Sequence, residues 1–561
     1  MPQDDAGETP SAPAEYALDE IKARAAAARA RSAELVAAEN RTAARPVWQY
    51  NHVIAYGQSL SSGWEGWPAL SVTPRHDSLM IGDSVNSTNE SGANWVPAGE
   101  AAFRPLVATV MTKAPAGEVL GAADVAALPV GTAALGETVL EGALDHWRGR
   151  QLALRTTHGW DAFAGQFVAS SCGVGGRTIE QLSPGATPPL FERPRMAAQL
   201  GKQLADQAGG SYGVAALVWL FGENNSVAAG GTQDRGEFVR LSASLQAAFN
   251  REIVAGIAMQ DRSPAIFTHQ VSGIYVRDAN AMSVPMAQLD CAYGLANWYL
   301  AAPSYPVTEK GGHLDPNGYR WLGQQFGKVM HKVLDLGEGW KPLHPLHATW
   351  RGTHVLVDFH VPHPPLAFSP CYVRTRSASF ADGGFSVTDD DGRIAVLAAA
   401  VVADVCVLLV LERVPGANPT LWYGGQAGHG GYGNLRDSDP TEASAVYEYR
   451  DGSGQYPGAN IPDLIGKPYP LWNWCVVFRA ELQADPAPVM VPTPVASPIE
   501  IPEAAAEPTA PPLPDYAEIV EPVLEPAPAP VAEPMPAAAQ TPEPATPHGL
   551  LAWLRQLFGR R

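Results

Sequence analysis

The chain is short of cysteine and of basic residues, and both shortages narrow the functions it can have. Its five cysteines are an odd number with no Cys-x-x-Cys pair. This pattern disfavours a zinc site or a disulfide scaffold and is typical of a reducing compartment. Lys and Arg total 38 against 57 Asp and Glu, a formal net charge of −19. Because a general nucleic-acid binder needs a basic face, we expect no nucleic-acid partner.

Targeting and membrane-spanning signals are also lacking. The acidic N-terminus has no apolar stretch, so no signal peptide is expected and a cytoplasmic location is predicted. One long apolar run, residues 394–411, is rich in valine and is interrupted by Asp404. It predicts two buried β-strands joined by a turn near Ala403 and Asp404, in preference to a spanning helix.

Composition changes along the chain predict its organisation. Short β-rich runs alternate with helical stretches between residues 48 and 336, which indicates βαβ units and a parallel sheet covered on both faces. Beyond about residue 340, β runs separated by Gly, Pro and Asp indicate a sandwich or partial barrel. The predicted segments are a disordered N-terminus (1–16), an Ala-rich helix (17–45), an α/β domain (46–338), an all-β accessory domain (339–482), a disordered Pro/Ala/Glu-rich linker (483–547) and an amphipathic C-terminal helix (548–561).

The terminal segment HGLLAWLRQLFGRR has the pattern of an amphipathic helix. Five apolar side chains fall on one helical face, with arginines available to the other. A short helix of this kind on a long linker is expected to dock to a protein partner or to a membrane surface. The alternative is an apolar tail without structure.

Loops that follow predicted strands carry the groups used in acyl transfer. Ser59 stands at a strand-to-helix turn in GQSLSSG, where a hydroxyl and backbone N–H groups can be exposed together. Gly175 and Gly176 permit close backbone approach in the second loop, and Asn224 offers an amide in the third. His313 precedes a helical stretch, where an imidazole can act as general base. Each feature alone is commonly a turn or a cap, but their order favours a site.

This ordered set resembles the SGNH hydrolase superfamily, the GDSL-like esterases, and within it the carbohydrate O-acetylesterase-like branch. The resemblance covers roughly residues 48–335 and rests on four blocks: GQSL (57–60), GVGGRTIEQL (173–182), WLFGENNS (219–226) and GGHLDPNGYRWLG (311–323). It implies a flavodoxin-like three-layer α/β fold with Ser59 as nucleophile and His313 as base. It also implies an oxyanion hole formed by the N–H groups of Ser59 and Gly176 and the side chain of Asn224. The C-terminal all-β part more weakly resembles accessory domains of some bacterial and phage-related members.

The chain departs from the family pattern beside the histidine. The family's last block is Asp-x-x-His, whereas Lys310 stands three residues before His313. We expect Glu309 to orient the imidazole, because one added glycine shifts the reach by a residue. Asp315 and a dyad without a carboxylate remain alternatives.

Two other serines, two tryptophans and the histidines are further candidates for functional residues. IGDSV contains a Gly-Asp-Ser but follows a weaker strand signal, so Ser59 is favoured over Ser84, and GGSYG precedes a strand, so Ser211 is rejected. Trp64 and Trp67 are candidates for a substrate-binding wall, with a core role as the even alternative. The histidines lack a matching carboxylate pair and no phosphate loop follows a strand, so no metal and no cofactor are expected.

The sequence therefore predicts a serine esterase that removes O-acetyl groups from a carbohydrate ester. The alternative, from a different class, is a non-catalytic carbohydrate-binding or assembly protein on the same scaffold. Reaction with a fluorophosphonate probe would separate the two, since only the enzyme has an activated serine.

Overall fold

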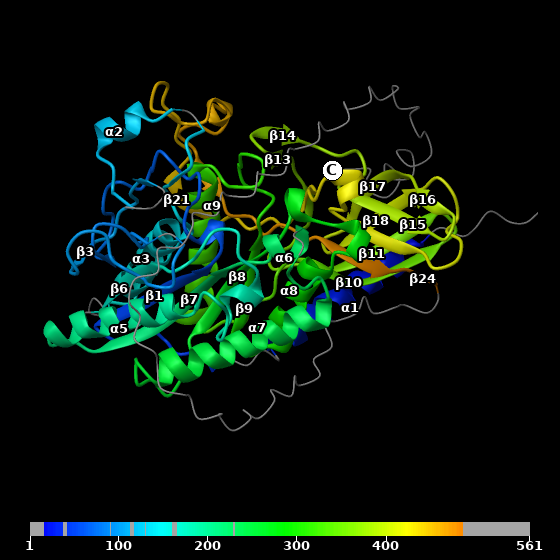
Figure 1. Ribbon diagram of the computed structural model, residues 1–561. Coiled ribbons are helices and arrows are strands. Elements are labelled where there is room, and N and C mark those ends of the chain that lie inside the picture. The colour runs from blue at the N-terminus through cyan, green and yellow to red at the C-terminus, as the bar shows by residue number, and fades with distance from the viewer. Residues whose placement is uncertain are drawn as a thin grey trace, which may run out of the picture. The chain divides into compact units, whose positions relative to one another are not determined.

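The β-rich runs of the first part of the chain lie together in one seven-stranded sheet of the computed structural model (Figure 1), which describes residues 16–37, 42–89, 91–112, 117–129, 131–159, 165–227 and 230–485. The strands stand in the order β3-β2-β6-β1-β7-β8-β9. Neighbours are parallel except for β2 and β3, which are antiparallel. The bounds are β1 Tyr50–Gly57, β2 Leu79–Ile81, β3 Phe103–Pro105, β6 Gln166–Ser171, β7 Tyr212–Leu220, β8 Ala265–Gln270 and β9 Trp298–Pro303.

The order of the five longer strands gives the sheet a switch point. Taken in chain order, β1, β6, β7, β8 and β9 stand in the arrangement 2-1-3-4-5, the doubly wound order of flavodoxin-like folds. The order reverses between β1 and β7, and ligands of such sheets bind there, beyond the carboxyl ends of the strands. The predicted α/β sheet is thus confirmed, and the candidate loops after β1, β6 and β7 all lie at this edge.

Helices cover both faces of the sheet. Val53 and Ala55 of β1 belong to the core beneath α3 and α9, whereas Ile54 and Tyr56 belong to the core on the opposite face. A strand buried on both faces reads as a nearly continuous apolar run, which is why residues 52–56 were recognisable as a strand. The covering helices are α3 Val139–Thr157 and α9 Pro316–Met330 on one face, and α5 Glu192–Gln207, α7 Arg235–Phe249 and α8 Ser283–Gly294 on the other.

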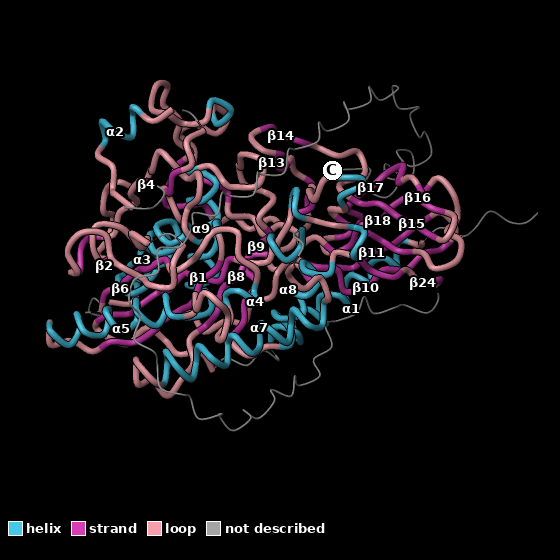
Figure 2. The backbone as a smooth tube through the Cα atoms, viewed as in Figure 1, coloured by secondary structure: helices cyan, strands magenta, loops and turns pink. Residues whose placement is uncertain are grey.

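Two further sheets follow in the chain and lie to one side of the first (Figure 2). The predicted strand pair at 394–411 is present as β17 and β18, with its turn at residues 404–405, but β18 is largely buried whereas β17 is mostly half-buried. Phe359 of β11 packs against Phe385 and Phe478 of the second sheet, with ring centroids 6.5 and 6.4 Å apart. The five-stranded sheet comprises β17 Val396–Ala403, β18 Cys406–Leu411, β11 His354–His360, β10 His344–Arg351 and β24 Gln483–Ala484, and the four-stranded sheet comprises β16 Gly392–Ile394, β15 Phe385–Asp389, β19 Thr420–Tyr423 and β23 Phe478–Glu481.

The Ala-rich helix α1 (Leu18–Ala37) packs on the five-stranded sheet. Its narrow apolar face buries Ile21, Ala25 and Ala28. Arg24 adds an ion pair with Asp358 of β11 at 2.9 Å. This helix therefore covers a sheet surface of its own chain through small residues and charge pairs.

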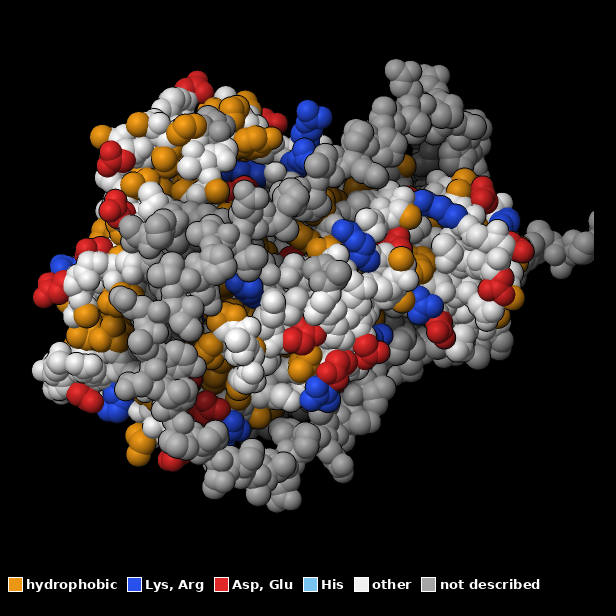
Figure 3. All heavy atoms as spheres, in the orientation of Figure 1, with side chains coloured by type: hydrophobic (Ala, Val, Ile, Leu, Met, Phe, Trp, Pro, Cys, Tyr) orange, Lys and Arg blue, Asp and Glu red, His pale blue; other side chains and the backbone are white. Residues whose placement is uncertain are grey.

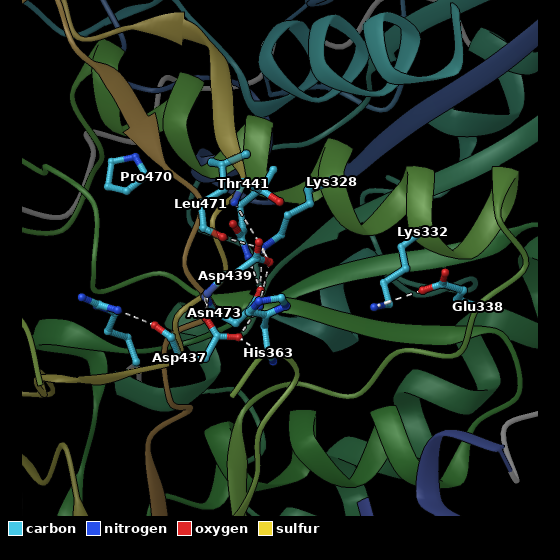
Figure 4. Close-up of polar contacts among 12 residues, drawn as sticks. Lys328, Lys332, Glu338, His363, Asp437, Asp439, Thr441, Pro470, Leu471 and Asn473 are labelled. Carbon is cyan, nitrogen blue, oxygen red and sulfur yellow. Dashed lines mark hydrogen bonds and ion pairs between the residues drawn. The ribbon is translucent and has the colours of Figure 1, made fainter. Parts of the chain in front are cut away.

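A polar cluster ties α9 to the segment that returns from the β-rich part (Figure 4). The ammonium of Lys328, in the last turn of α9, donates to Asp439 at 2.9 Å, to Asn473 at 2.7 Å and to the carbonyl of Leu471. Asp437 accepts from the side-chain amide of Asn473 at 2.7 Å. Removing one partner of a buried charged network is costly, so these contacts hold the two segments together.

On the face drawn in Figure 3, basic side chains lie interspersed with acidic, apolar and other polar ones. No helix among residues 16–37, 42–89, 91–112, 117–129, 131–159, 165–227 and 230–485 is long and apolar enough to cross a membrane.

The remaining helices and strands are short. They are α2 Ala122–Ala127, α4 Ile179–Leu182, α6 Glu223–Val227, α10 Gln426–His429, β4 Met111–Thr112, β5 Ala134–Leu135, β12 Ala367–Phe368, β13 Cys371–Val373, β14 Arg376–Ala378, β20 Leu435–Arg436, β21 Glu442–Val446 and β22 Pro468–Pro470.

The chain divides into two units, residues 1–499 and 500–561. The α/β part and the β-rich part fall in the same unit, and β24 begins where the linker was predicted to begin. The predicted domain boundaries stay predictions. The predicted disordered N-terminus up to residue 15, the linker from residue 486 and the C-terminal helix lie outside the described residues.

Candidate active site

Ser59 lies at the switch point, directly beyond β1. The strand ends at Gly57, and the residues Ser59–Ser61 form a single 3-10 turn. A Cβ at Gly57 would stand 2.0 Å from the carbonyl oxygen of Leu220, so only glycine lets β1 end this close to β7. The N–H of Gln58 then donates to that same carbonyl at 2.8 Å. This register places Ser59 at the edge of the sheet, where the residue is 8% exposed.

The imidazole of His313 lies against the Ser59 hydroxyl. Its Nε2 is 2.9 Å from Oγ, although the two residues are 254 positions apart in the chain. The other ring nitrogen, Nδ1, is 3.7 Å from Oε2 of Glu65. Hydroxyl, imidazole and carboxylate therefore stand in the order of a nucleophile, a base and an orienting acid.

The carboxylate comes from a loop that sequence reasoning missed. Glu65 adopts a left-handed backbone with φ 61°, and its N–H donates to the carbonyl of Ala134 at 2.9 Å. The Lys310 ammonium donates to the Glu65 carbonyl at 2.6 Å. The His313 imidazole, and further the Lys310 charge, hold the pKa of Glu65 below its ordinary value. Thus Lys310, three residues before His313, holds the loop that carries Glu65.

The two acids near His313 in sequence have other partners, which corrects the expectation for Glu309. One carboxylate oxygen of Glu309 accepts the N–H groups of Gly311 and, at 2.8 Å, Gly312. Its other oxygen accepts the Tyr432 hydroxyl at 3.1 Å. Asp315 caps α9 by accepting the Gly318 N–H at 2.8 Å. Both carboxylates shape the loop around His313, whereas Glu65 faces its ring. A search confined to the residues around the histidine could not find Glu65.

The glycine loop and the asparagine loop meet beside Ser59. The side-chain amide of Asn224 donates to the carbonyl of Gly176 at 2.8 Å, and its backbone N–H donates to the Gln58 side chain at 3.3 Å. A Cβ on Gly175 would be 4.0 Å from the Cβ of Ser59. The structure therefore brings together the loops that carry the three expected oxyanion-hole residues.

The structure places the remaining candidate residues from the sequence in different surroundings. The ring of Trp64 lies 6.2 Å from the His313 ring and packs, partly buried, against a small core cluster. Trp67 is 2% exposed, donates to the Thr132 carbonyl and belongs to a small core cluster, so it is removed from the substrate-binding candidates. Ser84 is completely buried and its oxygen accepts the Thr109 hydroxyl at 2.8 Å. Ser211 precedes the first residue of β7, at the opposite edge of the sheet.

A pocket opens next to Ser59 and His313. Leu60 and Gly312, the neighbours of those two residues in sequence, both contribute to its wall. Glu223 is 2% exposed and places one carboxylate oxygen on Nε2 of His269, while its other oxygen has no hydrogen-bond partner within the described part of the chain. The pocket is partly open to solvent and is lined by Leu60, Glu223, Ser272, Gly273, Ile274, Tyr275, Ser304, Tyr305, Glu309, Gly312, Leu314 and Tyr432.

The pocket wall carries hydroxyl and carboxylate groups and neither lysine nor arginine. The Tyr275 hydroxyl is protonated at neutral pH, as tyrosines ordinarily are, and burial raises its pKa further. The described residues hold no group of three or more His, Cys, Asp or Glu side chains that could bind a metal ion. The arrangement suits a neutral ligand that carries hydroxyl groups.

Comparisons with known proteins give only distant likenesses. No protein-family model and no curated protein matches the chain. A carbohydrate acetylesterase from Xanthomonas citri is 13% identical at a TM-score of 0.41, with 76% of this chain and 80% of that chain covered. A protein from Arabidopsis thaliana is 15% identical at a TM-score of 0.33, covering 51% and 99%.

An aryl esterase from M. smegmatis is 12% identical at a TM-score of 0.25, covering 51% of this chain and 99% of that chain. At these identities and TM-scores the likenesses assign neither a family nor a function to this chain.

Proposed function

We propose that the chain is a serine esterase. Ser59 attacks the carbonyl carbon of an ester while His313 accepts the hydroxyl proton and then passes it to the departing alcohol. Water next attacks the acyl-serine, with His313 again taking a proton, and the carboxylic acid leaves as Ser59 is restored. The observation that carries this proposal is the 2.9 Å contact between Nε2 of His313 and Oγ of Ser59 at the switch point of the sheet.

Two features of the surroundings support this role. Glu65, 3.7 Å from Nδ1, is placed to stabilise the positive charge that the imidazole gains in the transition state. The N–H groups of Ser59 and Gly176 and the amide of Asn224 are the proposed donors to the tetrahedral oxyanion. Preorganised donors of this kind usually make the largest single contribution to acyl-transfer catalysis.

The proposed substrate is an O-acetyl ester of a carbohydrate. The pocket beside Ser59 supports it, because the carboxylate oxygen of Glu223 that has no hydrogen-bond partner among the described residues can accept from a sugar hydroxyl. A wall that includes carboxylates and neither lysine nor arginine disfavours an anionic substrate. Trp64 offers an apolar ring beside the base, as a surface against which a sugar can pack.

The test is hydrolysis of p-nitrophenyl acetate and labelling by a fluorophosphonate probe, with wild type, Ser59→Ala and Ser84→Ala. We expect both activities in wild type and in Ser84→Ala, and neither in Ser59→Ala, with circular dichroism spectra unchanged. Ser84 is a matched control because it is a nearby buried serine in a Gly-Asp-Ser sequence. Absence of turnover and labelling in wild type would contradict the proposal and leave a carbohydrate-binding protein, to be tested with glycans.

A further inference from the structure

The β-rich part of the chain reaches into the loop that carries the proposed base. Tyr432, which follows α10 in the chain, donates its hydroxyl to the Glu309 carboxylate at 3.1 Å. Glu309 in turn accepts the backbone N–H groups of Gly311 and Gly312, the two residues before His313. The Tyr432 hydroxyl is thus connected to the His313 loop through one carboxylate.

A second, independent contact comes from the turn between β13 and β14. The carbonyl of Arg374 accepts the backbone N–H of Glu309 at 3.0 Å. Thus the main chain and the side chain of Glu309 are both held by residues from beyond position 370. Glu309 is 6% exposed as a residue, so each of its hydrogen bonds matters, because a buried acceptor that loses a donor is destabilised.

Close backbone packing fixes where Tyr432 stands. The Gly273 N–H donates to the Gly431 carbonyl at 2.9 Å, and a Cβ on Gly431 would be 2.0 Å from the Gly273 carbonyl oxygen. Gly273 lies in the loop after β8, at the carboxyl edge of the large sheet. The tyrosine therefore enters the site from a loop anchored on the sheet edge itself, and the residue is only 4% exposed.

We infer that Tyr432 and Glu309 are positioning residues that hold the loop 311–313 so that Nε2 of His313 meets the Ser59 hydroxyl. The β-rich part of the chain then helps to set the geometry of the active site. This inference rests on the proposed function, since it concerns the alignment of its base. Glu309 acts through hydrogen bonds to the loop backbone, which differs from a charge acting on the imidazole.

The experiment combines Tyr432→Phe with His313→Ala and measures p-nitrophenyl acetate hydrolysis. We expect Tyr432→Phe alone to lower kcat about tenfold with KM within about twofold, since the lost hydrogen bond is to a charged group. In the His313→Ala background the same substitution should change the residual rate less than about twofold, because the base it positions is gone. The matched control is Tyr212→Phe, which removes another buried hydroxyl, bonded to His52 at 2.7 Å at the amino end of β7.

Glu309 provides a second pair of variants if Tyr432→Phe folds poorly. Glu309→Gln can still accept the two glycine N–H groups and should keep most of kcat, whereas Glu309→Ala should lose at least as much as Tyr432→Phe. Equal losses in Glu309→Gln and Glu309→Ala would mean that the negative charge of Glu309 acts on the His313 imidazole. That result would overturn the positioning role.

The outcomes also separate this inference from the proposed function. Full activity in His313→Ala would overturn both. Loss in His313→Ala with wild-type kcat in Tyr432→Phe would overturn the inference alone, as would an equal loss from Tyr432→Phe in both backgrounds.

Discussion

Replacing Glu65 with glutamine tests the carboxylate beside the imidazole while keeping the length of the side chain. For unit charges 3.7 Å apart, Coulomb's law gives about 1 kcal/mol in bulk water and about 4.5 kcal/mol at an effective dielectric constant of about 20. The His313 and Glu65 side chains are 26% and 32% exposed, which places the interaction between these limits. Taking about 2 kcal/mol for the transition-state imidazolium predicts a loss of about 30-fold in kcat.

The assay is steady-state hydrolysis of p-nitrophenyl acetate, with thermal unfolding recorded for every variant. Glu65→Asp keeps the charge but draws it away from Nδ1, so an intermediate loss is expected. Glu237→Gln is the control for the substitution itself, because Glu237 also pairs with a cation, Arg240 at 2.6 Å, on the surface of α7. Its activity should equal that of wild type.

A Glu65→Gln enzyme with wild-type kcat and an unchanged unfolding temperature would refute this reasoning. The site would then work as a Ser59–His313 dyad, and the carboxylate would serve only to hold its loop. A large loss that Glu65→Asp shares in full would instead indicate that the position of the carboxylate, more than its charge, is what the imidazole requires.

Two further predictions follow from the site and the core. Asn224→Ala should lower kcat by a factor on the order of hundreds, as for other oxyanion-hole donors, with an unchanged circular dichroism spectrum; near-full activity would remove Asn224 from the site. Burial, and then the charge of Glu137, raise the pKa of Glu141 to about 8, so the folded chain keeps a proton that the unfolded chain releases at lower pH. The unfolding free energy should therefore fall as pH rises from about 5 to about 8, and Glu141→Gln should make that slope shallower in urea titrations at several pH values; equal slopes would contradict the assignment.

Local sequence patterns were sufficient for much of the α/β architecture. The run 265–270 coincides with β8, and the runs at 52–56 and 166–170 lie within β1 and β6. These strands are buried on both faces, so each reads as an apolar segment between turn residues. The strand pair at 394–411 was predictable because a charged residue interrupts its apolar run at the turn, although only β18 is largely buried.

Two elements were not among those predicted, although both have local signals. The strand β9 is a buried apolar run, and the helix α3 begins with a capping box formed by Thr138 and Glu141. The β-rich part was predicted as a separate domain, yet Tyr447 and Tyr469 pack in the same core as α3 and α9. Packing between distant segments leaves no periodic pattern in either one.

By itself, the sequence determined the order of the chemical groups: a serine after the first strand, a glycine pair, an asparagine and a histidine before a helix. These positions follow from strand ends and turn residues, which are local properties of the chain. Only the tertiary structure decided which carboxylate lies beside the imidazole. Glu65 reaches Nδ1 because its loop is held by Ala134 and Lys310, and Glu309 turns away because Tyr432 and two glycine N–H groups hold it. Such choices depend on how separate loops converge at one edge of the sheet, and spacing along the chain does not encode that convergence.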